Sequence, residues 1–202
     1  MWHSFSLRHN LTVHQLEQFK KFYDLLREYN EIVSLTAIDK PEEIIAHHFD
    51  DSLALSGLID LSAPLTLADI GSGGGFPGIP LKIKYPHLKI YLIEVKEKKV
   101  AYLKEVIEKL RLDSIEVIDL DWRTFLRKTE YKIDLFCARA SLPFADLMRM
   151  FKPASPYKKS SLAYWASRHW IAQQNEKEYI SKEFAYTIEN RQRRLVLLTA
   201  HA

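Results

Sequence analysis

An acid followed closely by a dense set of glycines is the part of the chain best suited to chemistry. Residues 67–78 read Leu-Ala-Asp-Ile-Gly-Ser-Gly-Gly-Gly-Phe-Pro-Gly and contain five of the six glycines of the chain. Glycine costs a helix or strand about 0.5–1 kcal/mol relative to alanine, so this density indicates positive φ angles or a ligand lying against the backbone. An apolar run, a glycine turn and a helical pattern in this order are typical of a nucleotide-binding βαβ unit.

The residues around the glycines narrow the class of nucleotide. A phosphate-binding NTPase loop ends in Gly-Lys-Ser/Thr, whereas this turn ends in Phe76, Pro77 and Gly78. A dinucleotide fingerprint can be drawn through Gly73, Gly75 and Gly78, but Asp69, two residues before the first glycine, would repel a pyrophosphate. An acid at this position suits a cationic ligand, and S-adenosylmethionine, with its ammonium and sulfonium groups, is such a ligand.

Further polar residues follow predicted strands. A buried-strand pattern over residues 88–93 ends at Glu94, at the distance from the glycines where an acid accepts hydrogen bonds from ribose hydroxyls. Strand patterns over residues 114–118 and 132–138 are followed by polar residues as well. Because ligands of a parallel sheet lie at the carboxyl ends of its strands, we expect one site there. Its candidate residues are Asp69, Glu94, Asp121 or Trp122, and Arg139.

The elements that must position these residues alternate between strand and helix. Helical patterns cover residues 14–30, a segment beginning at Pro41, and residues 96–110 and 143–151. A fifth strand is expected over residues 161–166, and strands over residues 183–188 and 194–199 should form a hairpin through residues 189–193. We therefore predict an α/β, Rossmann-like class I methyltransferase fold: a mostly parallel seven-stranded sheet, a terminal antiparallel hairpin and an N-terminal helical extension.

Composition sets the domain count and the surroundings. The chain has 202 residues, 47% hydrophobic and 27% charged, which is ordinary for one domain. We expect a helical cap over residues 1–60 and a cofactor-binding core over residues 61–202. No apolar run approaches the roughly 20 residues of a membrane helix, so we expect a cytoplasmic protein without a membrane partner. The net charge of +3 and the pI near 8.8 permit a polyanionic partner without requiring one.

Cysteine and histidine give little sign of redox or metal chemistry. Cys137 is the only cysteine and lies in an apolar run, so we expect a buried thiol. His47 and His48 are adjacent in a helical pattern and point to different faces, which argues against both binding one metal ion. We expect a structural or capping role for them and no metal.

Several blocks of sequence carry a family resemblance. In order, they are residues 34–38 (Ser-Leu-Thr-Ala-Ile), 41–44 (Pro-Glu-Glu-Ile), 48–53 (His-Phe-Asp-Asp-Ser-Leu) and 69–80, ending Gly-Phe-Pro-Gly-Ile-Pro. Glu94 with Lys98 and Lys99, then Arg123, then residues 138–140 (Ala-Arg-Ala) fall where the same family has landmarks. With these blocks the chain resembles the bacterial glucose-inhibited division protein B family, which are 16S ribosomal RNA guanine-N7 methyltransferases.

The resemblance implies a cofactor site, a substrate and a partner. It implies S-adenosylmethionine bound by Asp69, Gly71, Ser72, Gly73, Phe76, Gly78 and Glu94, with Asp121 and Trp122 near the adenine. Arg123 and Arg139 would lie by the methyl-transfer centre. The implied substrate is N7 of a guanine in the 530 loop of 16S ribosomal RNA (rRNA position 527), as naked RNA or in the small ribosomal subunit. We expect the protein to act as a monomer.

Guanine N7 carries an in-plane lone pair and no proton, so its methylation needs no general base. Positioning can lower such a barrier by roughly 7–11 kcal/mol in favourable cases. Arg139 would then grip a phosphate or the guanine O6. Candidate stacking platforms for splayed-out RNA are Trp122, Trp165 and Phe76. The candidate phosphate contacts are Lys158, Lys159, Arg168, Arg191, Arg193 and Arg194.

Two departures from the family pattern keep alternatives open. Phe125 stands where an acid usually follows Arg123, and Trp165 and Ala166 stand where the fifth strand usually ends in Lys-Gly. A catalytically weak or inactive RNA-binding or ribosome-assembly factor that keeps the fold is therefore one alternative. An NAD-dependent oxidoreductase using the same glycine turn is another, although the chain shows no separate substrate region for it.

Overall fold

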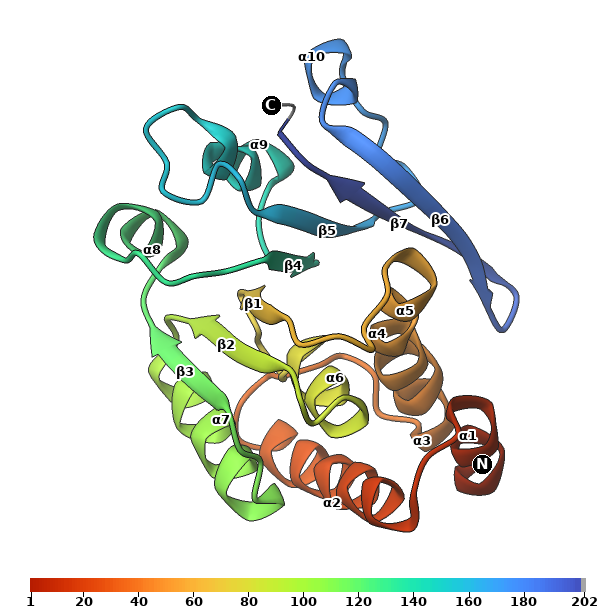
Figure 1. Ribbon diagram of the computed structural model, residues 1–202. Coiled ribbons are helices and arrows are strands. Elements are labelled where there is room, and N and C mark those ends of the chain that lie inside the picture. Colours follow the sequence, from red (N-terminus) through yellow and green to blue (C-terminus); the bar gives the residue numbers. More distant parts are fainter. Residues whose placement is uncertain (201–202) are drawn as a thin grey trace.

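A seven-stranded sheet organises the protein, for which a computed structural model describes residues 1–200 (Figure 1). The strand order is β3-β2-β1-β4-β5-β7-β6. The five parallel strands are β1 (Thr66–Ile70), β2 (Lys89–Glu94), β3 (Ile115–Asp119), β4 (Leu135–Arg139) and β5 (Ser161–Ala166). β6 (Ile180–Ile188) and β7 (Arg191–Leu198) form an antiparallel hairpin that joins the sheet through β5 and β7. The predicted mostly parallel sheet with a terminal hairpin is confirmed.

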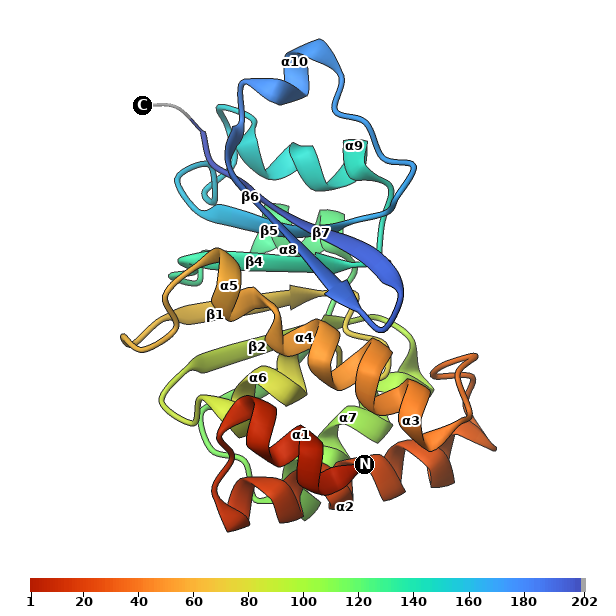
Figure 2. The same ribbon diagram turned by 90° about the vertical axis from the view of Figure 1, so that its right-hand side faces the viewer.

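Helices cover both faces of this sheet (Figure 2). α2 (Val13–Asn30), α6 (Gly78–Lys84) and α7 (Glu97–Leu110) form one apolar core with alternate strand residues such as Leu67 and Leu92. α8 (Trp122–Lys128), α9 (Phe144–Leu147) and the 3-10 turn η2 (Met148–Phe151) cover the opposite face, against Ala68 and Ile93. The two cores arise because successive residues of a strand point to opposite faces of the sheet.

The N-terminal helices lie beside α6 and the end of the hairpin. Pro41 opens a segment made of α3 (Pro41–Ile44), the π-helical turn η1 (Ile45–Asp50), α4 (Asp51–Leu53) and α5 (Leu55–Leu58). α2 begins with a capping box between Thr12 and Gln15. α1 (Trp2–His9) and the short α10 (Gln174–Lys177) have no counterpart in the sequence-based prediction. None of the helices within residues 1–200 combines the length and apolar character needed to cross a membrane.

The hairpin differs from the prediction in its turn. Residues 189–193 were expected to connect the two strands, but β6 runs to Ile188 and β7 begins at Arg191, which leaves Glu189 and Asn190 as the turn. Arg191 pairs with Ile188 and Arg193 with Tyr186. Polar residues do not end a strand when one side of a hairpin faces solvent, so the polarity of this segment was misleading.

Candidate active site

The glycine turn after β1 uses backbone conformations that other residues rarely adopt. Gly71, Gly73 and Gly75 have φ angles of 66°, 57° and 90°. A Cβ at Gly71 would lie 2.8 Å from Cβ of Ser141, so the turn touches the loop that follows β4. A Cβ at Gly73 would meet nothing closer than 3.8 Å. The turn therefore has an open backbone position where the strand order reverses between β1 and β4, the usual ligand site of such sheets.

Asp69 lies under this turn and is completely buried. Its Oδ2 accepts a hydrogen bond of 3.0 Å from the backbone N–H of Gly78. Its Oδ1 is buried without a hydrogen-bond partner among residues 1–200. Burial raises the pKa of Asp69 to about 7, although the bond from Gly78 acts in the opposite direction. Asp69 thus keeps one free acceptor oxygen and titrates near neutral pH.

Glu94, at the end of β2, connects the glycine turn to the next helix. Its Oε2 accepts a hydrogen bond of 3.0 Å from the N–H of Gly73, and its Oε1 accepts bonds of 2.9 Å from the N–H groups of Val95 and Lys96. The side chain is 6% exposed. Oε1 already accepts two bonds, whereas Oε2 accepts one and keeps further acceptor capacity, so the arrangement is compatible with the predicted contact to ribose hydroxyls. Ser72, also buried, donates its hydroxyl to the carbonyl of Asp69 at 3.0 Å.

Arg139 ends β4 and is held in a network with the η1–α4 segment. Nη1 donates to Oδ2 of Asp51 at 2.7 Å and to the carbonyl of His47 at 2.9 Å, and Nη2 donates to Nδ1 of His48 at 2.7 Å. The guanidinium also lies 5.4 Å from the ring centroid of Phe76 in the glycine turn. Three of its five N–H donors are therefore used by the protein, which leaves two for a substrate.

His48 is neutral and has one defined tautomer in this network. Arg139 only donates hydrogen bonds, so Nδ1 of His48 accepts and Nε2 carries the proton that reaches Oγ1 of Thr36 at 2.7 Å. Burial, and then the charge of Arg139, lower the pKa of His48 to about 3. Its ring stacks on Phe76 with the centroids 4.5 Å apart. His48 therefore holds Arg139 against the glycine turn without adding a charge.

A cavity of about 310 Å³ lies beside Arg139 at the carboxyl ends of β4 and β5. Asp51 is buried in its wall with both oxygens engaged, Oδ2 by Arg139 and Oδ1 by the hydroxyl of Tyr186 at 2.7 Å. The carbonyl of Asp51 accepts the indole N–H of Trp165 at 3.0 Å. The lining includes His47, His48, Tyr164, Arg193 and Arg194. Among residues 1–200, no three His, Cys, Asp or Glu side chains lie close enough to hold a metal ion.

The residues predicted near the adenine have structural contacts of their own. Asp121 caps α8: its Oδ1 accepts from the N–H groups of Arg123 and Thr124 at 3.0 Å. Trp122 is 5% exposed, packs in the core below α8 and donates its indole N–H to the carbonyl of Asp146. Arg123 points outward and pairs with Asp146 at 3.3 Å. Arg123 therefore shares no direct partner with Arg139.

The predicted phosphate contacts separate into two groups. Lys158 and Lys159 precede β5, so they lie at the amino end of the parallel strands, away from Arg139. Arg168 follows the carboxyl end of β5, and β7 runs antiparallel to β5, so Arg191 and Arg193 lie at the same edge as Arg139. Lys159 and Arg168 are therefore close in the sequence but lie at opposite ends of β5, which runs across the sheet between them.

The predicted stacking platforms are largely buried. Phe76, Trp122 and Trp165 are 6%, 5% and 8% exposed. Phe76 packs between His48, Phe22 and the guanidinium of Arg139, so its ring faces are occupied by the protein. Trp165 lines the Arg139 cavity.

Sequence reasoning assigned no function to Asp51, Tyr186, Thr36 or Ser141, although each contacts the site. Asp51 lies in a block that carried the family resemblance, which was the available signal. No sequence signal marks Tyr186, because a tyrosine in an edge hairpin usually serves packing. Cys137 is fully buried, as predicted, and burial raises its pKa. It pairs with Asp69 across β1 and β4, which was not predicted.

The strand order and the position of the glycine turn are those of the class I methyltransferase fold. Among solved structures, the METTL16 MTase domain is similar with a TM-score of 0.60 and 16% identity, over 86% of this chain and 77% of that one. The structure of M. capricolum TrmK in complex with S-adenosyl-homocysteine has a TM-score of 0.56 and 18% identity, over 74% of this chain and 67% of that one. At these identities the likeness is one of fold.

The sequence comparisons identify the family. Residues 15–197 match the GidB family model, described as rRNA small subunit methyltransferase G. The chain is 42% identical over 150 residues to the ribosomal RNA small subunit methyltransferase G of Lachnoclostridium phytofermentans, and 38% over 164 residues to that of Desulfitobacterium hafniense. These matches cover 73% and 81% of this chain. The chain belongs to the rRNA small subunit methyltransferase G family.

The coverage of the relatives is smaller. The matched region spans 62% of the length of the Lachnoclostridium phytofermentans protein and 67% of that of the Desulfitobacterium hafniense protein. It spans 61% of the ribosomal RNA small subunit methyltransferase G of Bacillus cytotoxicus, which is 36% identical to this chain.

Proposed function

We propose that this protein is a methyltransferase that uses S-adenosylmethionine to methylate N7 of a guanine in 16S ribosomal RNA. Membership of the family is the observation that carries the proposal. The site supports it, since the glycine turn, Asp69 and Glu94 lie together at the point where the strand order reverses. The family also removes the reason for considering a nicotinamide-dependent oxidoreductase.

The residues around the glycine turn fit the cofactor. The free Oδ1 of Asp69 is an acceptor suited to the amino-acid part of S-adenosylmethionine, and Gly73 leaves its backbone open to close approach. Glu94 would accept the ribose hydroxyls. Gly71, Ser72 and Gly78 shape the turn, while Asp121 and Trp122 would border the adenine through the start of α8. Bound there, S-adenosylmethionine supplies an electrophilic methyl group on a sulfonium.

Arg139 is proposed to position the guanine. N7 attacks with its own lone pair, so no side chain has to remove a proton, and the chain's contribution is alignment. Two N–H donors of Arg139 remain for the guanine O6 or a neighbouring phosphate. Asp51 and His48 fix its guanidinium, so its orientation is set before RNA binds. Arg123, which is exposed and paired with Asp146, is proposed to contact the substrate at the outer edge of the site.

The finer parts of the proposal concern substrate and setting. We propose the guanine of the 530 loop as the target, the small ribosomal subunit or its naked RNA as the partner, and the cytoplasm as the location. We further propose that the chain works as a monomer with a helical cap at residues 1–60 and a catalytic core at residues 61–202.

The test is transfer of a labelled methyl group to small-subunit RNA, followed by mass spectrometry of the nucleosides. Both naked 16S RNA and small subunits lacking the modification are offered. Asp69→Asn and Arg139→Lys are compared with the wild type, because Arg139→Lys keeps a charge beside Asp51 but removes the planar fork. Arg111→Gln, at the C-terminal end of α7, is the matched control.

We expect 7-methylguanine from the wild type and the control, and a loss of at least about 100-fold in transfer for Arg139→Lys, about 2.7 kcal/mol of barrier. Binding of the cofactor without labelling of either RNA would refute the enzyme and favour an RNA-binding factor. A product other than 7-methylguanine would refute the assigned atom.

A further inference from the structure

Arg193 is an arginine without a partner beside the candidate active site. It lies on β7, is partly buried, and lines the cavity next to Arg139. Within residues 1–200, no acidic side chain lies within ion-pair distance of it, and its Nε is buried without a hydrogen-bond acceptor. Because the buried Nε lacks an acceptor and the residue is only partly buried, the guanidinium can accept an anion from outside the chain.

The neighbouring arginines differ from Arg193 because the protein itself satisfies them. Arg194 donates Nη2 to the carbonyl of Trp170 at 2.8 Å and stacks over its ring, with Glu183 at 3.5 Å. Arg139 is paired with Asp51. Among the three arginines that line the cavity, only Arg193 has its charge uncompensated by the described part of the chain.

His47 is a second unsatisfied group in the wall of the same cavity. His47 is 4% exposed, and neither of its ring nitrogens makes a hydrogen bond within residues 1–200. Glu189 lies 3.3 Å from Nε2, without hydrogen-bond geometry, and its side chain is 49% exposed. A buried imidazole lacking a fixed partner can donate one N–H to a ligand after a small adjustment.

The chemistry of the free groups favours an anion over a base edge. The Watson–Crick edge of guanine presents N–H donors and would require acceptors in the cavity. Within residues 1–200, the only carboxylate in the lining is that of Asp51, whose two oxygens already accept from Arg139 and Tyr186. The remaining lining groups include the hydroxyls of Tyr164 and Ser167, which can donate or accept. His47 can donate one N–H, and Arg193 only donates and carries a positive charge. A ligand that presents only acceptors, such as a phosphodiester, matches them.

We propose that the Arg139 cavity is a subsite for one phosphodiester of the RNA, bound by Arg193 with a second hydrogen bond from His47. The inference rests on the proposed function, since it takes RNA as the source of the phosphate. The subsite adjoins the cofactor turn, because Arg139 and Ala140 line the cavity and Ser141 touches Gly71. The bound phosphate therefore belongs to the target nucleotide or its immediate neighbour.

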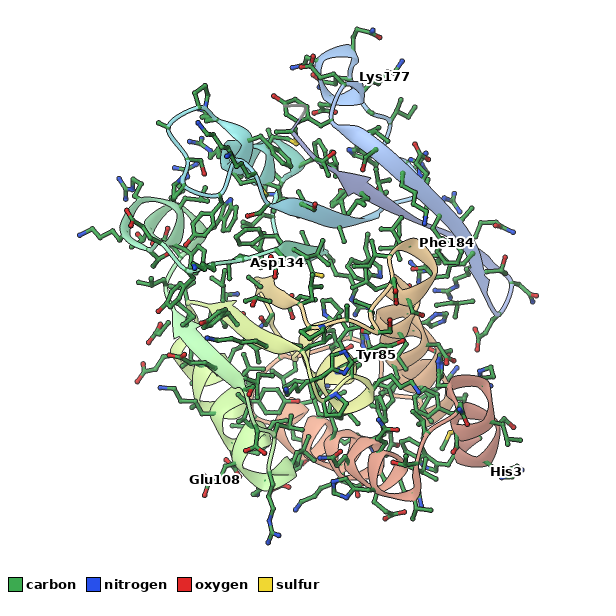
Figure 3. The ribbon with its side chains drawn as sticks, in the orientation of Figure 1. His3, Tyr85, Glu108, Asp134, Lys177 and Phe184 are labelled. Carbon is green, nitrogen blue, oxygen red and sulfur yellow. The ribbon has the colours of Figure 1, made fainter. Side chains whose placement is uncertain are left out.

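The experiment measures RNA affinity as a function of salt. Filter binding of labelled 16S RNA, and of small subunits, is recorded with S-adenosylhomocysteine from 50 to about 300 mM KCl. Arg193→Gln is compared with Arg193→Lys, which keeps the charge, and with Arg111→Gln. Arg111 is an exposed arginine three residues beyond Glu108, which Figure 3 labels at the far end of α7 from the site. Circular dichroism verifies that each variant is folded.

Losing one phosphate contact should reduce the slope of log affinity against log salt by about 0.7 for single-stranded RNA. We expect this for Arg193→Gln, with the slope restored in Arg193→Lys and unchanged in Arg111→Gln. Arg193→Gln should lower the affinity by the same factor for unchanged RNA and for RNA whose target guanine is replaced by adenine, because a phosphate carries no sequence information. His47→Gln should weaken binding by about tenfold at one salt concentration.

An unchanged slope in Arg193→Gln overturns the proposal, and so does an equal reduction in Arg111→Gln. A loss that disappears when the guanine is replaced would assign Arg193 to the base instead. Absence of RNA binding by the folded wild type also overturns it. The methyl-transfer assay reports separately: transfer with an unchanged Arg193→Gln slope refutes the subsite alone, whereas a reduced slope without transfer refutes the methyltransferase alone.

Discussion

Asp69 combines complete burial, one free oxygen and a pKa raised to about 7. A nearby cationic group on the bound cofactor favours the ionised carboxylate, so cofactor binding should be linked to loss of this proton. We expect the affinity for S-adenosylmethionine to fall by up to about tenfold per pH unit below pH 7, and to be far less dependent on pH in Asp69→Asn. Calorimetry between pH 5.5 and 8.5 measures both. Equal affinity of the wild type at pH 5.5 and 8.5 would contradict the linkage.

His48 should make the protein sensitive to acid. Its folded pKa of about 3 lies below the ordinary value of 6.5, so between these values the unfolded chain binds a proton that the native state does not. The free energy of unfolding therefore falls as the pH drops through this window, by up to about 1.4 kcal/mol per unit. Asp69 acts oppositely from about pH 4 to 7, since its raised pKa makes the native state bind the extra proton.

The two residues should partly cancel in the wild type, and single variants should separate them. In His48→Gln only the Asp69 effect remains, so the free energy of unfolding should be lower at pH 6.5 than at pH 4.5. In Asp69→Asn only the His48 effect remains, so it should be higher at pH 6.5 than at pH 4.5. Urea unfolding at the two pH values gives the comparison. If both variants keep the wild-type difference between pH 4.5 and 6.5, the assigned protonation states are wrong.

At the scale of elements, the contact between α5 and β6 holds the hairpin against the N-terminal helices. Gly57 faces Phe184, which Figure 3 labels beside α5, and a Cβ at Gly57 would lie 2.3 Å from the ring. Gly57→Ala should therefore destabilise the protein by about 1–3 kcal/mol through overpacking. In a Phe184→Ala background the same change should cost much less, because the clashing ring is absent. Urea unfolding of the four proteins measures the coupling, and additive losses would refute this contact.

The same hairpin shows what local pattern does and does not predict about elements. The five parallel strands were placed within a few residues because most are buried apolar runs and each lies beside a helical pattern; β3, with only one buried residue, combines apolar and acidic residues. The start of β7 was missed, since Arg191 and Arg193 are polar and only pairing with β6 makes them strand residues. α1 was missed because its helical face gains its partners, such as Phe19 and Phe49, only in the folded protein.

At the scale of the whole molecule, cofactor binding should stabilise the fold, because its proposed residues come from the ends of several strands. A ligand at 100 times its dissociation constant stabilises a protein by about 2.7 kcal/mol. For a chain of this size this corresponds to an increase in Tm of about 5–11 °C. We expect this increase with S-adenosylhomocysteine and none with NADH at the same concentration, measured by differential scanning fluorimetry. An increase with NADH alone would restore the oxidoreductase alternative.

The sequence by itself determined the class of fold, the glycine turn with Asp69 and Glu94, and the family. These features are local: a strand, a turn and an acid at a fixed spacing are written in consecutive residues, and the conformations of Gly71, Gly73 and Gly75 follow from the lack of a side chain. The expectation that Asp69, Glu94 and Arg139 lie at one edge of the sheet also followed, because parallel strands bring their carboxyl ends together.

Only the tertiary structure decided which groups remain free to act. Arg139 is held by Asp51 and His48, which lie about 90 residues earlier in the chain, and its cavity is completed by a hairpin from the other end. The basic residues of the last quarter were divided between two edges because β5 runs between them. Hydrogen bonding and burial are properties of neighbours in space. The sequence offers Arg123, Arg139 and six basic residues of the last quarter as candidates, but it cannot show that Arg193 is the one whose charge is uncompensated beside Arg139.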